Sequence, residues 1–395
     1  MILYLTLLTL FAALYVIIRA VFPLKSKWYI KALLALAVVA AAGKFHLLYF
    51  IEGENFFSPV LPAWMIWSGS WLFCAVMSFS LLLLAADIVR LPLYLLLWLL
   101  HRKPAVRWHR LSMLTNVGML ILSLALTGWG TWCGVRAPEV HHLTLELPVR
   151  AEDAAPVRLV QLTDLHADST KDADFYRDIV RRTNELAPDI VVITGDFADG
   201  TVQDCGYALQ PLAELNAPMG IFAVTGNHDY FWNRDGKNWT DYLSGLGLRF
   251  IDDQAHELCL PAGNGKFKRL RLLGLRDPMS HRTGRPPLPL TELCRNASSP
   301  SPSVLLAHQP QIAPLAAELG IQLQLSGHTH GGQFPGLQSL VAGKNRGYVR
   351  GLYRVGNMQL YVSAGTSLWT PVCMRLGVPS EITLIDIVPV KIKAQ

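Results

Sequence analysis

The sequence predicts an α/β domain built on a layered β-sheet, preceded by an all-α membrane domain of about four transmembrane helices. Apolar residues are concentrated before about residue 135. After residue 157, short apolar runs typical of buried strands alternate with amphipathic segments typical of helices. Polar side chains recur where these strands end. We therefore divide the chain into a transmembrane domain (1–135), a connector (136–156) and an α/β domain (157–395).

The charge of the chain is also unevenly distributed. The net charge is +6 over 395 residues, but the segment up to Cys133 alone carries ten Lys/Arg against three Asp/Glu. The remainder carries 25 Lys/Arg against 26 Asp/Glu and is nearly neutral. The positive charge therefore reports membrane topology, and it excludes the basic surface that nucleic-acid binding requires. We expect a bilayer as a partner and no nucleic acid.

Four apolar stretches in the first third are long enough to cross the ~30 Å of a bilayer as helices. The first has no basic N-terminal region and no small-residue cleavage pattern, so we interpret it as an anchor and not a removable signal peptide. The apolar stretch 91–100 has only ten residues and is expected to lie along the interface or to extend the third helix. The predicted spans are 1–22, 28–51, 63–86 and 111–133.

The charges between the predicted spans decide the orientation. Lys and Arg cluster between the first and second spans and again between the third and fourth, whereas the intervening loop carries only glutamates. We expect the basic loops in the cytoplasm, and the N-terminus and everything after Cys133 on the extracytoplasmic side of a bacterial inner membrane. A true crossing at 91–100 would reverse this topology. The charged residues are Lys25, Lys27, Lys31, Glu52, Glu54, Arg102, Lys103, Arg107 and Arg110.

Asp87 and Arg90 are charged residues beside the third predicted span. We expect them to form a salt bridge at the level of the headgroups; a transport or proton-relay role is the alternative. Of the six cysteines, Cys205, Cys259, Cys294 and Cys373 could pair in three ways in an oxidising compartment, or remain separate buried thiols.

The α/β domain is predicted from the alternation of apolar runs along the chain. A short edge strand is expected at 143–147, and the basic, Gly- and Pro-rich stretch 263–289 is expected to be a surface loop. The predicted helices are 174–186, 205–215, 239–246 and 312–319. The predicted strands are 157–162, 188–194, 220–225, 249–260, 270–275, 303–307, 321–325, 360–364 and 382–388.

Ligand-type side chains follow five of these strands. Each alone has an ordinary explanation, such as a helix cap, a turn or a buried histidine in the core. Because ligands bind beyond the carboxyl ends of strands in such sheets, their combination favours one site. Mixed Asp, Asn and His donors suit two ions such as Mn, Fe, Zn or Co and not a structural zinc site. The residues are Asp164, His166, Asp196, Asn227, His308, His328 and His330.

These motifs resemble the calcineurin-like metallophosphoesterase family, in particular its bacterial membrane-associated branch. The likeness covers roughly residues 145–390 and includes Asp-x-His at 164–166, Gly-Asn-His-Asp at 226–229 and Gly-His-x-His at 327–330. The resemblance implies a four-layer sandwich of two mixed sheets flanked by helices. It also implies that Asp164, His166 and His330 hold one ion, that Asn227, His308 and His328 hold the other, and that Asp196 bridges them.

The same resemblance assigns catalytic roles to two further residues. His228 would face the scissile phosphate, stabilise charge or protonate the leaving oxygen, and Asp229 would orient its imidazole. Asp168 departs from the family pattern, which usually has glycine there, and this difference would alter the entrance beside the first ion.

The sequence therefore predicts a membrane-anchored phosphoesterase with two metal ions. It would hydrolyse a phosphate ester or phosphodiester, expected to be lipid-linked or part of the cell envelope, by attack of a metal-bridging hydroxide. The basic residues Lys266, Lys268, Arg269, Arg271, Arg282 and Arg285 would contact phosphate headgroups or form an ordinary solvated surface. The alternatives are an inactive docking module of the same fold and a transporter with a regulatory outer domain.

Overall fold

The computed structural model describes residues 2–53, 56, 59, 61–100, 106–149, 154–231, 237–295 and 301–391. Glu54, Arg102 and Lys103, on which the predicted topology partly depends, lie outside these residues. The chain forms two compact units. The helical unit comprises Met1–Cys133 with Thr370–Met374, and the sheet unit comprises Gly134–Trp369 with Arg375–Gln395.

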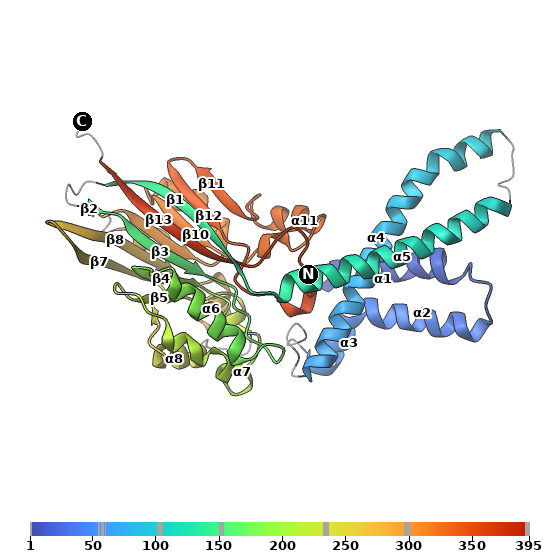
Figure 1. Ribbon diagram of the computed structural model, residues 1–395, viewed down its shortest axis with the longest axis horizontal. Helices are drawn as coiled ribbons and strands as arrows, with labels where there is room; N and C mark the ends of the chain where they lie inside the picture. The colour runs from blue at the N-terminus through green and yellow to red at the C-terminus, as the bar shows by residue number, and fades with distance from the viewer. Residues whose placement is uncertain are drawn as a thin grey trace. The chain divides into compact units, whose positions relative to one another are not determined.

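The helical unit follows the apolar stretches of the sequence. α4 continues without a break through Pro92, so the stretch 91–100 extends the third predicted helix, as one of the two sequence expectations had it. α4 and α5 are close where the Ser123 Oγ donates to the Ala75 carbonyl (2.7 Å), and they diverge towards residue 100 (Figure 1). The helices are α1 (Ile2–Val16), the π-helix η1 (Ile17–Val21), α2 (Trp28–Ala42), α3 (Lys44–Glu52), α4 (Ala63–Leu99) and α5 (Val106–Val135).

The four predicted spans are not all confirmed by the described residues. By length and composition, α4 and the stretch Leu111–Val135 could each cross a membrane, and α2 with α3 could form a third, broken span bent by 64°. The first predicted span yields the apolar stretch Thr6–Val21. This apolar stretch is shorter than α4 and Leu111–Val135, so it is not confirmed as a span.

Two charged residues of the helical unit, Asp87 and Lys44, have polar partners inside it. The predicted Asp87–Arg90 salt bridge is present (3.1 Å), and Asp87 also accepts from Arg19 Nε (2.6 Å) and from the Tyr15 hydroxyl (2.6 Å). Buried Lys44 donates from Nζ to the Ser70 hydroxyl (2.7 Å) and to a backbone carbonyl in the 370–374 segment (2.9 Å). The ion pairs of Asp87 balance its charge, and the two acceptors of Lys44 satisfy its donors in apolar surroundings.

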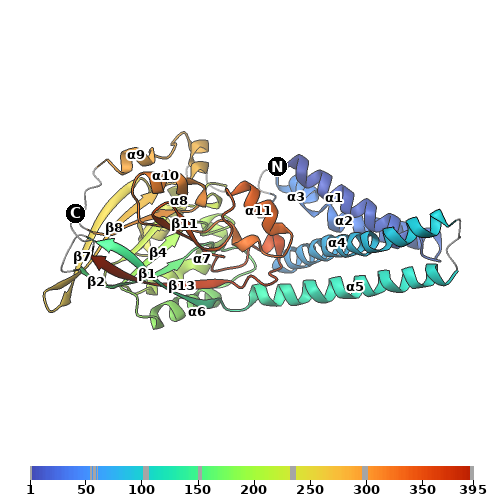
Figure 2. The same cartoon turned by 90° about the horizontal axis from the view of Figure 1, so that it is seen from above.

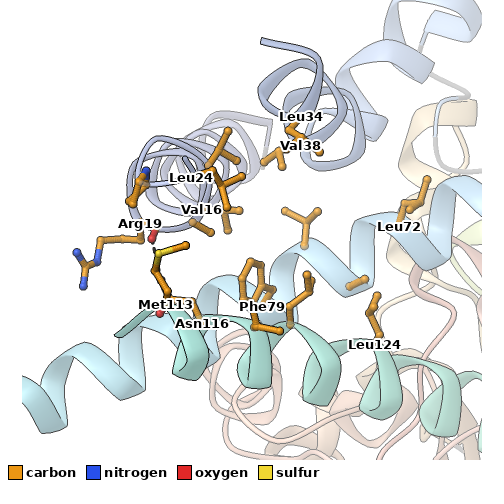
Figure 3. Close-up of a pocket in the computed structure, with 17 residues that line it drawn as sticks. Val16, Arg19, Leu24, Leu34, Val38, Leu72, Phe79, Met113, Asn116 and Leu124 are labelled. Atoms are coloured by element: carbon orange, nitrogen blue, oxygen red, sulfur yellow. Dashed lines mark hydrogen bonds between the residues drawn. The ribbon is translucent and has the colours of Figure 1, made fainter. Parts of the chain in front are cut away.

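An apolar pocket of about 320 Å³ lies between the helices of this unit. Figure 3 shows Val16, Leu34, Phe79 and Leu124 among its lining residues. Arg19 lines one end, where its backbone carbonyl accepts a hydrogen bond from the Asn116 side chain (2.8 Å).

The sheet unit contains two mixed sheets. Sheet A has the order β1-β13-β3-β4-β5-β6 and sheet B the order β11-β12-β10-β9-β8-β2, with β7 paired to β8. The strands are β1 (Glu139–Val149), β2 (Ala154–Ala155), β3 (Val157–Leu162), β4 (Ile190–Thr194), β5 (Ile221–Val224), β6 (Arg249–Phe250), β7 (Gln254–Gly263), β8 (Lys266–Leu275), β9 (Ser303–Ala307), β10 (Leu323–Ser326), β11 (Gly351–Val355), β12 (Met358–Val362) and β13 (Glu381–Lys391).

Four layers follow from the way these sheets bury their faces. Leu159 of β3 and Leu306 of β9 belong to one buried cluster between the two sheets. The other face of sheet A packs against α6 (Ala173–Glu185), α7 (Val202–Leu209) and α8 (Lys237–Gly245), which lie together on that side in Figure 1. The other face of sheet B packs against α9 (Leu290–Leu293) and α10 (Ala313–Glu318), seen in Figure 2. This is the predicted four-layer arrangement, with hydrophobic burial holding each pair of layers together.

Three of the predicted segments of the sheet unit differ clearly from the structure, and β11 and α11 (Leu337–Lys344) were not predicted. The predicted strand 249–260 is divided between β6 and β7, because a turn falls at Asp252 and Asp253. The first part of the predicted surface loop 263–289 is β8, whose Arg271 is buried and pairs with Glu257 (3.6 Å). Within the predicted connector, β1 pairs with β13 in parallel, so the expected short edge strand is real but longer.

The cysteines are free thiols. Cys205, Cys294 and Cys373 are buried, whereas Cys259 is exposed on β7. The expectation of separate thiols therefore agrees with the structure, apart from the exposure of Cys259.

Candidate metal centre

The seven predicted ligands lie at the carboxyl ends of five strands, three in sheet A and two in sheet B. Asp164 and His166 follow β3, Asp196 follows β4 and Asn227 follows β5. On the other sheet, His308 follows β9, and His328 and His330 follow β10. Since parallel strands end at the same edge, alternation of strand and helix brings these distant positions together.

The backbone at this edge is strained. Five of the seven predicted ligands have positive φ, from 43° at His166 to 71° at His328. The other three are Asp164 (54°), Asp196 (56°) and His330 (48°). For residues other than glycine this region costs on the order of 1–3 kcal/mol each and is tolerated where function requires it. The strain identifies this edge as a functional site.

Two glycines allow the carboxylates to approach the neighbouring turns closely. A Cβ atom at Gly226 would lie 2.2 Å from Asp196 Oδ1, and one at Gly327 would lie 2.2 Å from Asp164 Oδ2. Any side chain at either position would displace a predicted ligand. The glycines of the Gly-Asn-His-Asp and Gly-His-x-His motifs therefore serve the geometry of the site directly.

The first group of donors consists of Asp164, His166 and His330. The Nε2 atoms of the two histidines are 3.0 Å apart, and His330 Nε2 is 3.4 Å from Asp164 Oδ1. His166 Nε2 is 3.8 Å from the same carboxylate oxygen. One donor atom from each residue lies within 4.8 Å of the others. These are the residues assigned to the first ion.

The second group consists of Asp196, Asn227, His308 and His328. His308 Nε2 lies 3.1 Å from Asp196 Oδ2 and 3.1 Å from Asn227 Oδ1. The rings of His308 and His328 are 5.1 Å apart between centroids. Asp196 Oδ2 is also 3.7 Å from His166 Nε2 in the first group. This carboxylate thus lies between the two groups, at the place a bridging ligand would occupy.

The site's electrostatics divides its histidines into two classes. Burial disfavours charge on His166 and His308, but the nearby carboxylates of Asp199 and Asp196 outweigh it and raise each pKa to about 10. Burial and the neighbouring His308 lower the pKa of His328 to about 4. Burial also lowers the pKa of His330. Without ions, protons on two imidazoles balance the buried carboxylates.

Contacts behind the ligands fix the orientation of their rings. His308 Nδ1 donates to the Thr194 carbonyl (2.7 Å), which leaves Nε2 free to face the centre of the site. His166 Nδ1 lies 3.0 Å from Asp199 Oδ2. Such outer contacts are usual around metal-binding histidines and set which nitrogen is available.

Asp199 is a functional residue that the sequence analysis missed. Its Oδ1 is 2.5 Å from His228 Nδ1, and its Oδ2 faces His166, so one carboxylate holds two site histidines. The side chain is 1% exposed. The signal in the sequence was a second aspartate three residues after Asp196, and only the fold shows where it points.

The predicted contact between Asp229 and His228 is wrong. Among the described residues, Asp229 accepts hydrogen bonds from the backbone N–H groups of Gly226 (2.7 Å), Phe197 (2.8 Å) and Asp196 (3.2 Å). Burial and the charge of Asp196 raise the pKa of Asp229 to about 7, against the lowering effect of these amides. Asp229 therefore ties two ligand-bearing turns together, and Asp199 orients His228.

Asp168, which departs from the family pattern, closes the turn after His166. Its carboxylate accepts from the Thr170 backbone N–H (2.8 Å) and from Lys171 Nζ (3.1 Å). Lys171 Nζ also donates to the His166 carbonyl (2.8 Å). The aspartate thus supports the strained backbone at His166.

The chemistry of the donor set fits a pair of ions. Three groups of His and Asp each place their donor atoms within 4.8 Å: Asp164, His166 and His330; His166, Asp196 and His228; and Asp196, His308 and His328. Imidazole and carboxylate together suit borderline transition metals, and no thiolate takes part. Cations in these positions would replace the protons on His166 and His308 and balance the buried carboxylates.

Comparison with known proteins points the same way. The sequence model of the calcineurin-like phosphoesterase family matches residues 157–332. A transmembrane protein with a metallophosphoesterase domain from Danio rerio is 33% identical over 275 residues, 67% of this chain and 61% of that protein. This chain thus spans about three fifths of that relative's length.

The chain is also similar to a bacterial protein and to a solved structure. An uncharacterized metallophosphoesterase from Campylobacter jejuni is 30% identical over 278 residues, 70% of each chain. The crystal structure of a dimetal phosphatase from Danio rerio aligns with a TM-score of 0.37 and 14% identity, covering 54% of this chain and 88% of that one.

Proposed function

This chain belongs to the calcineurin-like metallophosphoesterase family of metal-dependent phosphoesterases, and we propose that it is a membrane-anchored hydrolase of phosphate esters or phosphodiesters. The observation that supports this is the convergence of seven Asp, Asn and His side chains from five strand ends on one buried edge. Such a set of donors is far from what a structural zinc site or a docking surface requires.

Each ion has a set of residues that would hold it. Asp164, His166 and His330 would bind the first ion, and the second would be bound by the ligands Asn227, His308 and His328. Asp196 would contact both. When bound, two such ions supply a nucleophile from water at neutral pH and neutralise charge on the phosphoryl group. Among the chain's own residues, Asp199 and the Thr194 carbonyl keep the histidine rings aimed at the ions.

His228 supplies the proton chemistry in this proposal. Asp199 holds its Nδ1, so Nε2 remains for the substrate. Burial disfavours its charge, but the carboxylates of Asp199 and Asp196 raise its pKa and so favour the protonated imidazole. The Nε2–H would stabilise the negative phosphoryl oxygens and pass its proton to the departing alcohol oxygen.

We further propose that the substrate is a phosphorylated lipid or an envelope component reached from the membrane surface. The helices that could cross a membrane support anchoring, and the positive charge in the predicted loops supports an extracytoplasmic site. A reporter enzyme that is active only outside the cytoplasm, fused after Pro148, tests the orientation. An inactive fusion that is expressed normally, together with activity of a reporter that works only in the cytoplasm fused at the same place, would contradict it.

The hydrolase proposal is tested on the purified full-length protein in detergent. We expect about two transition-metal ions per chain by elemental analysis and release of 4-nitrophenol from 4-nitrophenyl phosphate or its bis-ester. Chelation should remove the activity, and adding back Mn²⁺, Zn²⁺, Co²⁺ or Fe²⁺ should restore it. Metal-loaded protein that turns over neither ester would contradict the proposal and favour an inactive docking module.

A further inference from the structure

A pocket lies beside the metal centre, at the carboxyl ends of two neighbouring strands of sheet B. It has a volume of about 440 Å³, within the range of small-molecule sites. The strands β8 and β9 run parallel with Leu275 opposite Ala307, and the next residue after β9 is the predicted ligand His308. The pocket therefore lies at the edge of sheet B that carries a predicted ligand of the metal centre.

The walls of this pocket are mainly apolar. They are formed by the crossover after β8, by the residues that follow β9 and by α10. Leu275 and Leu290 are buried behind the wall, whereas Leu288, Ile312 and Leu315 are only partly buried and can contact a bound molecule. Burying these partly exposed leucine and isoleucine side chains against an apolar group of a bound molecule would be favourable.

Most charged groups of the pocket already have protein partners. Arg276 pairs with Asp253 (3.0 Å), and the Asp277 carboxylate accepts from Gln309 Nε2 (2.9 Å). Arg346 is exposed at the pocket, and within the part of the chain that the structure describes it has no carboxylate at ion-pair distance. One uncompensated cation beside apolar walls complements an anion that carries an apolar group.

We propose that this pocket is the subsite for the apolar arm of the substrate, an alkyl or isoprenyl chain attached close to the phosphoryl group. The proposal rests on the proposed hydrolase function and adds to it the place where the apolar arm of a phosphorylated amphiphile binds. The phosphoryl group would lie among the predicted ligands that include His308, and the chain would lie against Leu288, Ile312 and Leu315. Arg346 favours an anionic amphiphile over a neutral one.

The chain length of the bound molecule gives a direct measure of the subsite. Burying one methylene group improves binding by about fourfold, which corresponds to ~0.8 kcal/mol. Alkylphosphonates from methyl- to octylphosphonate share one headgroup and differ only in chain length. Used as competitive inhibitors of 4-nitrophenyl phosphate hydrolysis, they should give an inhibition constant that falls at least tenfold across the series, below the concentration at which they form micelles.

Two substitutions at Leu288 test the place of binding. Leu288→Trp should fill the pocket and Leu288→Ala should remove part of its wall. In both variants octylphosphonate should bind at least threefold more weakly, with methylphosphonate unchanged. The matched control is Leu340→Trp, because Leu340 is an exposed leucine (64% exposed) on α11 (Leu337–Lys344) that does not line the pocket.

The outcomes separate the subsite from the hydrolase function. An active enzyme whose inhibition does not depend on chain length would overturn the subsite and leave the hydrolase intact. So would an unchanged chain-length dependence in both Leu288 variants, or an equal loss in Leu340→Trp, which would show that the loss is not specific to the pocket. Absence of hydrolysis in metal-loaded wild-type protein would instead overturn the proposed function itself. If Leu288→Trp unfolds, Leu288→Ala alone decides.

Discussion

The helical unit and the sheet unit treat their polar groups in opposite ways. In the helical unit, Asp87 is surrounded by Arg19, Arg90 and Tyr15, so this carboxylate is balanced by two guanidinium groups. In the sheet unit, carboxylates and imidazoles of the same buried edge crowd together on a strained backbone. The first arrangement stabilises a fold, whereas the second stores free energy that a bound cation would release.

The largest loss of hydrolysis should come from a substitution of Asp196, the carboxylate between the two donor groups. Asp196→Asn removes the charge that both ions would share, and we expect it to abolish hydrolysis while the fold is retained. The measurements are turnover of 4-nitrophenyl phosphate, metal content and the thermal unfolding midpoint. Asp386→Asn, at a partly exposed carboxylate on β13, is the control and should keep its activity. Retained turnover in Asp196→Asn would refute the bridging assignment.

A smaller loss is expected at His228, which touches the substrate but not the ions in the proposed function. His228→Gln should lower kcat by about 10²- to 10⁴-fold, the usual contribution of a general acid. Metal content should be unchanged, and this distinguishes the variant from Asp196→Asn. Loss of metal together with activity would show that His228 is itself a ligand, as its proximity to His166 and Asp196 allows.

The roles of Asp199 and Asp229 can be separated by making the same Asp→Asn substitution at each position and comparing activity with stability. Asp199→Asn should reduce activity about 10- to 100-fold, the usual effect of losing a contact behind a metal ligand. Asp229→Asn should mainly reduce stability, because the carboxylate accepts three buried backbone N–H groups and each weakened bond to a charged group is worth about 1.5–3 kcal/mol. The reverse pattern would restore Asp229 as the residue that orients His228.

Metal binding should also release protons. In the ion-free protein His166 and His308, with pKa values of about 10, hold protons at pH 8. A metal ligand must be a neutral imidazole, so each binding event displaces one proton and affinity rises about tenfold per pH unit per proton. Calorimetry in buffers of different ionisation enthalpy should detect about two protons per chain. Binding without proton release would contradict the raised pKa values.

Sequence patterns predicted the strands best where both faces are buried. The bounds of β3 and β9 were predicted correctly because each strand is rich in apolar residues and is preceded by a proline, Pro156 or Pro302. β8 was partly mistaken for a loop since Lys266, Lys268 and Arg269 lie close together in its first half. In the structure Lys268 pairs with Asp189, and Arg271 pairs with Glu257 on β7. Local composition cannot show such partners.

The candidate site shows the same division between local and tertiary information. The seven ligand positions were predictable because each follows a strand, and strand ends share one edge. The contact of Asp199 with His228 was not predictable, since it depends on the path of the chain after β4. The pocket beside His308 was not predictable either, because its walls come from separate segments between residues 275 and 346.

The smallest effect on hydrolysis is expected from the buried lysine of the helical unit. Lys44→Met removes donors to Ser70 and to a carbonyl of the 370–374 segment but keeps the length of the side chain. We expect a thermal midpoint lower by a few degrees, since a hydrogen bond from a charged group contributes about 1.5–3 kcal/mol. Turnover of 4-nitrophenyl phosphate should stay within about twofold of wild type.

The control is Lys31→Met, which should change neither quantity. The Nζ of Lys31 donates to the Phe22 carbonyl (2.8 Å) on an exposed face. A loss of turnover in Lys44→Met as large as that in Asp199→Asn would show that the polar contacts of the helical unit also govern the chemistry of the sheet unit, and the contrast between the two units would not hold.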